Sequence, residues 1–133
     1  MRLDHVGIVV DDLEQAKHFL AEILGLEMTN EVAIESAKLR AAYFRCGEVE
    51  IELLELGDSA ARQARLGIGV KANIEHIAVE VDALDSVLAM INQRGVETTP
   101  PQPILGGLGV WTDPATSNGI RFQIIEKEVA GAS

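Results

Sequence analysis

The amino-acid sequence predicts an α+β fold made of two copies of one βαβββ module. An internal repeat is the first observation that predicts it: LDHVGIVVDDL at 3–13 aligns with IEHIAVEVDAL at 74–84, an offset of 71 residues. The same offset places EIELLE at 50–55 over RFQIIE at 121–126. An offset that holds at both ends of a module indicates duplication. The second observation is hydrophobic periodicity, which changes from the strand period to the helix period once in each copy.

The repeat also gives the expected boundaries within one domain, residues 1–133. The modules cover about 1–56 and 72–127, and residues 57–71 form a linker with one short helix. Of the 133 residues, 47% are hydrophobic and 24% are charged, so the chain can bury a single packed core.

Charge and cysteine content exclude several classes of function. Eleven Lys and Arg against 21 Asp and Glu give a net charge of −10, which disfavours binding to nucleic acid or to anionic membranes. No apolar run approaches the ~20 residues of a membrane span, and the N-terminus does not have the pattern of a signal peptide. The single cysteine, Cys46, is expected to be packed and cannot form an intramolecular disulfide. We therefore expect a cytoplasmic protein.

The first module begins with the strand DHVGIVV and continues into a helix from about Asp12 to Leu24. Asp12 and Gln15 resemble a capping box, and Gly25 suits the end of a helix. The strands LEMTNEV, LRAAYFR and VEIELLEL follow. The apolar stripe of this helix comprises Leu13, Ala16, Leu20 and Ile23.

The second module repeats this order. EHIAVEV is the strand, Asp82 is the expected helix cap, and Gly95 ends the helix. The strands VETT, GVWTD and IRFQIIEK follow, and PPQPILGGLG at 100–109 is expected to be a loop over the mouth of a cleft. The apolar stripe of the second helix comprises Leu84, Val87, Leu88 and Ile91.

Alternation along the strands separates the face that packs on the helix from a face that carries polar groups. In each module that polar face carries one histidine and one oxygen-bearing side chain, and the repeat makes the pairs His5/Glu52 and His76/Gln123 equivalent. Two imidazoles, a carboxylate and an amide oxygen suit Zn, Ni, Co, Mn or Fe(II). We expect these four residues to bind one divalent metal ion; the alternative is a polar cleft that binds a ligand without metal.

These segments resemble the vicinal oxygen chelate superfamily, and within it the methylmalonyl-CoA epimerases most closely. The matching segments are DHVGIVVDDLEQA, FLAEILGLE, GEVEIELLE, EHIAVEVDALDSV, NQRGVE and DPATSNGIRFQII, which span about residues 3–127. The resemblance implies two modules paired by pseudo-twofold symmetry into a cupped β-sheet with its helices on the outer face. It also implies metal ligands at His5, Glu52, His76 and Gln123, and a homodimer.

The resemblance further implies a metal-dependent isomerase that deprotonates a carbon acid, with an acyl-CoA or another acidic metabolite as its substrate. The epimerase pattern has glutamate bases at the positions that Gln123 and Arg40 occupy here, and neither side chain can transfer that proton at neutral pH. Glu52 is then the expected catalytic base. Arg40 is either a substrate-binding residue that pins a carboxylate or phosphate, or a surface residue at a strand edge.

Three other functions fit parts of the same pattern. A glyoxalase I-type lyase uses a similar metal site, and an Fe(II) dioxygenase uses two histidines and a carboxylate, here His5, His76 and Glu52. A metal-free binding protein of the bleomycin-resistance kind is the alternative without catalysis. Its expected aromatic groove fits poorly with an aromatic content of 4%.

Overall fold

The computed structural model describes residues 1–128 and divides into two compact units. The N-terminal unit comprises His5–Glu75, and the C-terminal unit comprises the described residues from 76 to 128 together with Met1–Asp4. Strands β1 (Arg2–Val10) and β5 (Ala72–Glu80) each contribute residues to both units. No helix in the described residues is long and apolar enough to cross a membrane.

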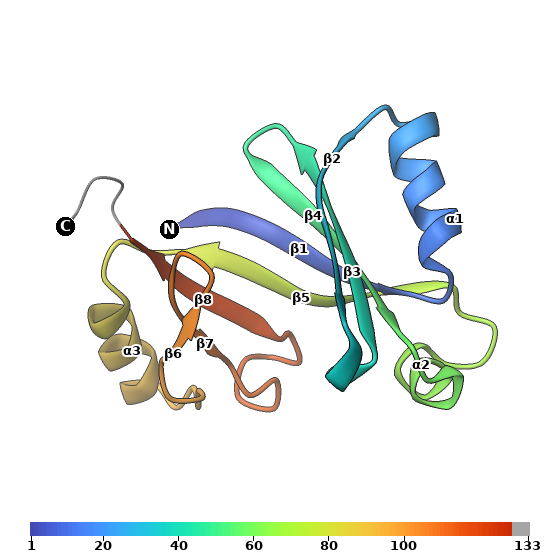
Figure 1. Ribbon diagram of the computed structural model, residues 1–133. Coiled ribbons are helices and arrows are strands. Elements are labelled where there is room, and N and C mark those ends of the chain that lie inside the picture. The colour runs from blue at the N-terminus through green and yellow to red at the C-terminus, as the bar shows by residue number, and fades with distance from the viewer. Residues whose placement is uncertain (129–133) are drawn as a thin grey trace. The chain divides into compact units, whose positions relative to one another are not determined.

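In the N-terminal unit, helix α1 packs on one face of a sheet with the order β2-β3-β4-β1 (Figure 1). Strand β1 runs parallel to β4, whereas β2, β3 and β4 pair in antiparallel fashion. Leu13 and Phe44 are fully buried in the core between the helix and the sheet. The elements after β1 are α1 (Leu13–His18), β2 (Glu27–Ile34), β3 (Leu39–Cys46), β4 (Val49–Leu56) and the linker helix α2 (Ser59–Leu66).

The C-terminal unit repeats this order as β5-β8-β7-β6, with β5 parallel to β8. Helix α3 packs on one face through Leu84, which meets Val110 and Ile124 of the sheet. This confirms the predicted α+β fold of two βαβββ arrangements. The elements after β5 are α3 (Leu84–Gln93), β6 (Gln102–Ile104), β7 (Gly107–Trp111) and β8 (Phe122–Lys127).

The first helix begins as predicted but changes its pitch. The Asp12 carboxylate accepts a hydrogen bond from the Gln15 N–H at 3.1 Å, as in a capping box. From Phe19 to Ile23 the helix widens to a π-helix, in which the Leu24 N–H donates to the Phe19 carbonyl five residues back. The wider turn rotates Ile23 out of the apolar stripe, so the prediction that Ile23 packs in the core is wrong: it is 64% exposed.

The start of α3 corrects a second prediction. Its N-cap residue is Ala83, not Asp82, and Ala83 has no side chain that can accept a hydrogen bond. Asp82 instead forms an ion pair with Arg2 at 2.9 Å. In both units a glutamate of the neighbouring strand accepts a hydrogen bond from the first N–H of the helix: Glu55 of β4 accepts from the Leu13 N–H, and Glu126 of β8 from the Leu84 N–H. These tertiary caps lie at equivalent positions of the repeat.

The segment before β7 corrects a third prediction. VETT contributes only an isolated bridge between Thr98 and Thr112, and the strand lies further along, inside the segment expected to be a loop. Strand β6 pairs with β7 around Gly106, whose φ of +82° suits a tight turn. A proline is tolerated in β6 because this strand lies at the sheet edge. Cys46, expected to be packed, is exposed.

Candidate metal centre

The N-terminal unit places His5 and Glu52 on neighbouring parallel strands. Glu52 lies opposite Gly7 in the register of β1 and β4, and His5 lies two residues before Gly7 on the same face. The opposite face of these strands packs on α1. Glu52 is 8% exposed although it carries a carboxylate, and the residue beside it on β1 is a glycine. The unit therefore presents an imidazole and a buried carboxylate on the face away from its hydrophobic core.

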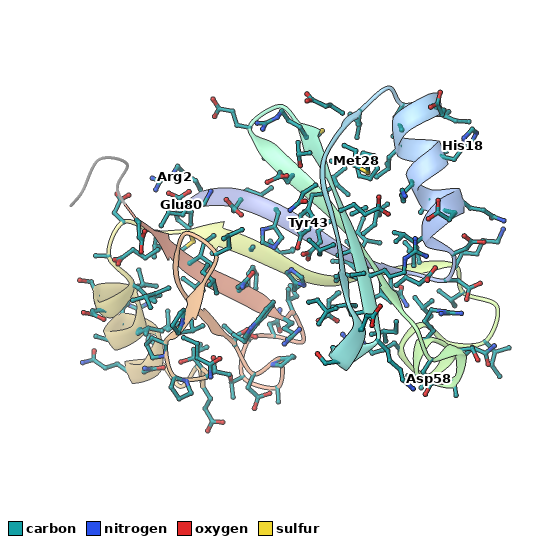
Figure 2. The ribbon with its side chains drawn as sticks, viewed as in Figure 1. Arg2, His18, Met28, Tyr43, Asp58 and Glu80 are labelled. Atoms are coloured by element: carbon teal, nitrogen blue, oxygen red, sulfur yellow. The ribbon has the colours of Figure 1, made fainter. Side chains whose placement is uncertain are left out.

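The Tyr43 side chain extends from β3 (Figure 2). The register of β3 and β4 places it directly opposite Glu52, on the same face. Burial, together with a hydrogen bond to Glu52 and its negative charge, raises the pKa of the Tyr43 phenol well above its ordinary value. The phenol therefore keeps its proton at neutral pH and acts as a hydrogen-bond donor to the Glu52 carboxylate. The sequence reasoning did not select Tyr43, although the odd-numbered residues of β3 share the face of Glu52.

The C-terminal unit places His76 and Gln123 in the same way. Gln123 lies opposite Ala78 in the register of β5 and β8, and His76 lies two residues before Ala78. His76 is 4% exposed and Gln123 is 9% exposed, both on the face away from α3. A small residue again stands beside the oxygen-bearing side chain. The two pairs therefore occupy equivalent places, as the repeat predicts.

Trp111 takes the place of Tyr43 in the C-terminal unit, because it lies opposite Gln123 on β7. Its ring meets the His76 imidazole edge to face, with centroids 4.9 Å apart and an interplanar angle of 89°. The Arg121 guanidinium carbon lies 3.9 Å from the centroid of the Trp111 ring. Burial lowers the pKa of Arg121 from its ordinary value. This face therefore carries a cation where the other carries acidic groups.

The donor types fit a divalent transition metal. Each unit offers one imidazole and one side-chain oxygen, and buried polar groups gathered away from an apolar core are costly unless they are engaged. A set of ligands that combines imidazole with carboxylate or amide oxygen suits transition metal ions of intermediate hardness, whereas Ca and Mg prefer sites made of oxygen ligands only. The structure thus brings His5 beside Glu52 and His76 beside Gln123, each within its own unit.

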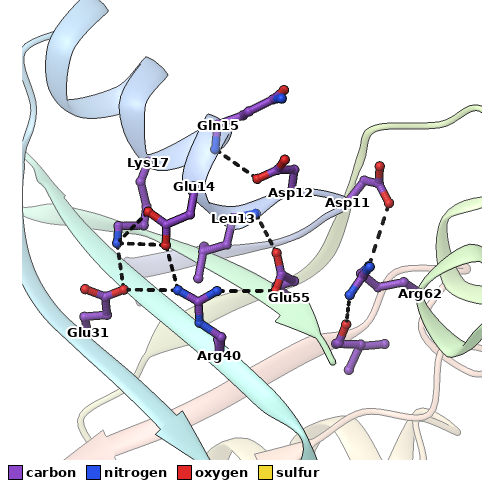
Figure 3. Close-up of polar contacts among 11 residues, drawn as sticks. Asp11, Asp12, Leu13, Glu14, Gln15, Lys17, Glu31, Arg40, Glu55 and Arg62 are labelled. Carbon is purple, nitrogen blue, oxygen red and sulfur yellow. Dashed lines mark hydrogen bonds and ion pairs between the residues drawn. The ribbon is translucent and has the colours of Figure 1, made fainter. Parts of the chain in front are cut away.

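Arg40 lies on the opposite face of its strand from Tyr43 and Glu52. Its guanidinium contacts the carboxylates of Glu14 at 2.6 Å, Glu55 at 3.6 Å and Glu31 at 3.8 Å (Figure 3). The hydrogen bond to Glu14 is the main cause that raises the pKa of Arg40. These contacts connect α1 to β2, β3 and β4, so they give Arg40 a structural part. Its role in binding substrate stays a prediction.

Comparison with known proteins identifies the family of the chain. The sequence model of the Glyoxalase/Bleomycin resistance protein/Dioxygenase superfamily matches residues 2–124. The chain belongs to this superfamily, the vicinal oxygen chelate superfamily.

The individual proteins to which this chain is similar include methylmalonyl-CoA epimerases. The uncharacterized protein YqjC of Bacillus subtilis is 29% identical over 129 residues, which is 94% of this chain and 91% of YqjC. The mitochondrial methylmalonyl-CoA epimerase of Homo sapiens is 24% identical over 127 residues, 92% of this chain and 72% of that protein. The crystal structure of methylmalonyl-CoA epimerase from Mycobacterium tuberculosis superimposes with a TM-score of 0.79, at 22% identity, over 96% of this chain and 89% of that one. The chain is therefore similar to epimerases in sequence and in fold.

Proposed function

We propose that this protein is a metal-dependent epimerase of a carbon acid carried as an acyl-CoA thioester, of the methylmalonyl-CoA type. The observation that carries the proposal is the buried Glu52 carboxylate, which lies beside an imidazole on the face away from the hydrophobic core. Family membership and the epimerases among its relatives support the reaction class.

We further propose that His5, Glu52, His76 and Gln123 hold one divalent ion of Co, Ni, Mn, Zn or Fe. When bound, such an ion supplies Lewis-acid stabilisation of the negative charge that develops on the substrate's thioester oxygen. The protein supplies the remaining chemistry through its own side chains.

Glu52 acts as the base in this proposal. Its carboxylate takes the proton from the carbon between the thioester and the second carboxyl group, and the electron pair of that C–H bond moves toward the thioester carbonyl. Once planar, the carbon turns its other face toward the Glu52 carboxylate, and the proton returns to that face, which inverts the configuration. The Gln123 amide cannot exchange this proton, so Glu52 serves in both directions. Tyr43, held protonated by its raised pKa, donates to Glu52 and orients it.

Metal content of the three histidine variants tests the site. Elemental analysis of protein purified without chelators is expected to give about one transition metal ion per chain. His5→Ala and His76→Ala should both lose it because each removes one imidazole. His18→Ala is the matched control, since His18 is exposed on α1. If the wild-type protein takes up none of the five metals, the proposed metal site is wrong, and a metal-free small-molecule binding protein becomes the better hypothesis.

Exchange of the substrate α-proton with deuterated solvent tests the reaction. Methylmalonyl-CoA should incorporate deuterium with the wild-type protein and lose this exchange with Glu52→Gln. Glu48→Gln, which changes an exposed glutamate near the β3–β4 turn, should behave as wild type. Conversion of a hemithioacetal without exchange on methylmalonyl-CoA would point to the lyase, and oxygen consumption to the dioxygenase.

The resemblance implies the assembly of the protein, and the residue pattern and cysteine content of the sequence imply its location. A homodimer and a cytoplasmic location both stay predictions. Size-exclusion chromatography with light scattering measures the first, and cell fractionation the second.

A further inference from the structure

The polar face of the C-terminal unit carries an arginine held in place by an aromatic ring. The guanidinium carbon of Arg121 lies 3.9 Å from the centroid of the Trp111 ring, a cation–π distance. Both side chains share the face that carries Gln123, because Trp111 lies opposite Gln123 and Arg121 precedes it by two residues. The His76 imidazole meets the same ring in an edge-to-face contact. The arginine is therefore part of the face that holds the proposed metal ligands of this unit.

Hydrogen bonds on both sides fix the backbone beneath this stack. The Thr99 hydroxyl accepts from the Trp111 N–H at 2.9 Å, and the Thr99 N–H donates to the Trp111 carbonyl at 2.9 Å. The Arg121 carbonyl accepts from the Ile77 N–H at 3.1 Å. Since the long arginine side chain is already ordered against the ring, less conformational entropy is lost when it binds an anion.

Comparison of the two copies of the module shows that the position of Arg121 does not carry a cation in both. The position equivalent to Arg121 in the N-terminal unit is Glu50, whose carboxylate accepts a hydrogen bond from the Thr29 hydroxyl at 2.6 Å. One copy of the module thus carries a carboxylate, and the other a guanidinium, at the same point of the same face. In a chain with a net charge of −10, a partly buried arginine beside proposed metal ligands marks a local site for an anion.

We propose that Arg121, stacked on Trp111, is the subsite that binds the carboxylate of the substrate. Stacking engages the flat face of the guanidinium, whereas its N–H groups lie in the plane and donate sideways in a fork that matches a carboxylate. This inference rests on the proposed function and deepens it: the substrate class is an acyl thioester that bears a second, ionised carboxyl group.

Tryptophan fluorescence offers a direct test because Trp111 is the single tryptophan of the chain. Chelator-treated protein is titrated with malonate at constant ionic strength, with neutral malonamide as the comparison probe. Malonate should change the fluorescence to saturation, and malonamide should not. Arg121→Gln should weaken malonate binding by about tenfold or more, as expected for a charge-assisted hydrogen bond. Arg121→Lys keeps the charge but loses the planar fork, so its affinity should lie between the two.

Arg94→Gln is the matched control, since Arg94 is an exposed arginine at the end of α3 in the same unit. It should bind malonate as the wild type does, and circular dichroism checks that each variant is folded. No saturable response in the wild type, or equal affinity in the wild type and Arg121→Gln, would overturn the subsite. If Arg121→Gln fails to fold, then Arg121→Lys with wild-type affinity would overturn the planar fork.

The same variants separate this inference from the function on which it rests. Malonate binding needs neither metal nor turnover, so a wild-type protein that binds malonate through Arg121 but never exchanges the α-proton overturns the epimerase alone. In an active enzyme, Arg121→Gln should raise KM for methylmalonyl-CoA about tenfold while leaving exchange on propionyl-CoA, which lacks the second carboxyl group, at the wild-type rate. An equal loss on both substrates would assign Arg121 a structural part only.

Discussion

The polar faces of the two units have the same scaffold and different charges. The N-terminal face carries His5 with Glu52, Tyr43 and Glu50, and the C-terminal face carries His76 with Gln123, Trp111 and Arg121. Each residue of one group has its counterpart in the other. The histidines are kept, whereas the two carboxylates become an amide and a guanidinium. In the proposed function, both copies of the module keep an imidazole and an oxygen ligand, whereas the proton-transferring carboxylate belongs to one copy and the anion-binding guanidinium to the other.

The largest expected effect comes from moving the carboxylate between the two faces. Glu52→Gln should lower the rate of α-proton exchange by about 10²–10⁴-fold, the usual contribution of a general base. The double variant Glu52→Gln with Gln123→Glu restores one carboxylate and one amide at equivalent positions, and it should recover part of the exchange. The measurement is deuterium incorporation by mass spectrometry. A double variant as inactive as the single one would show that only the N-terminal face supports the base.

The next effect concerns Tyr43, which is the single tyrosine of the chain, so absorbance of its phenolate reports on the N-terminal face alone. Burial first, and Glu52 second, raise its pKa, so the folded protein should ionise well above the ordinary value of ~10. Glu52→Gln should move this titration part of the way back, because the burial remains.

The same shift gives the sign of a stability effect. A raised pKa in the folded state stabilises the protein below the unfolded pKa, and the contribution disappears as the pH rises from that value toward the folded one. The free energy of unfolding of the wild type should therefore fall in alkaline solution more than that of Tyr43→Phe, as measured by urea unfolding over a pH series. Parallel curves for the two proteins would contradict the assignment.

The smallest effect compares the two helix starts. Asp12 and Ala83 have the same extended backbone, with φ of −134° and −137°, but only Asp12 caps its helix through a side chain. Ala83→Ser should raise the free energy of unfolding by about 0.5–1 kcal/mol, and Asp12→Ala should lower it by about 1 kcal/mol. Serine adds an acceptor without adding charge beside Asp82 and Asp85. Thermal unfolding of both variants measures the difference, and an Ala83→Ser protein that is no more stable than the wild type would contradict the prediction.

Much of the proposed site could be predicted because it depends on local patterns. The offset between His5 and His76, and the alternation of apolar and polar residues on β4 and β8, are properties of the chain itself. They place Glu52 and Gln123 on the face away from the helices, where the structure has them.

Tyr43 and Trp111 could not be found by the repeat. They occupy equivalent register positions, opposite Glu52 and Gln123, but lie 68 rather than 71 residues apart. The connection between β7 and β8 is longer than the hairpin between β3 and β4, so the alignment that pairs the histidines separates the aromatic residues. Strand register joins residues that are distant in sequence, and it depends on the turns between them.

The sequence by itself determined the duplication, the fold class and the face of each strand, because hydrophobic period and repeat spacing are local and survive in the unfolded chain. Only the tertiary structure decided which side chains meet. In the folded protein, the π-helical turn exposes Ile23 to solvent. Arg40 forms ion pairs with three carboxylates on the helix-covered face of the sheet, and Arg121 stacks on Trp111. Such contacts depend on strand register and on packing between elements, which exist only once the sheet has formed.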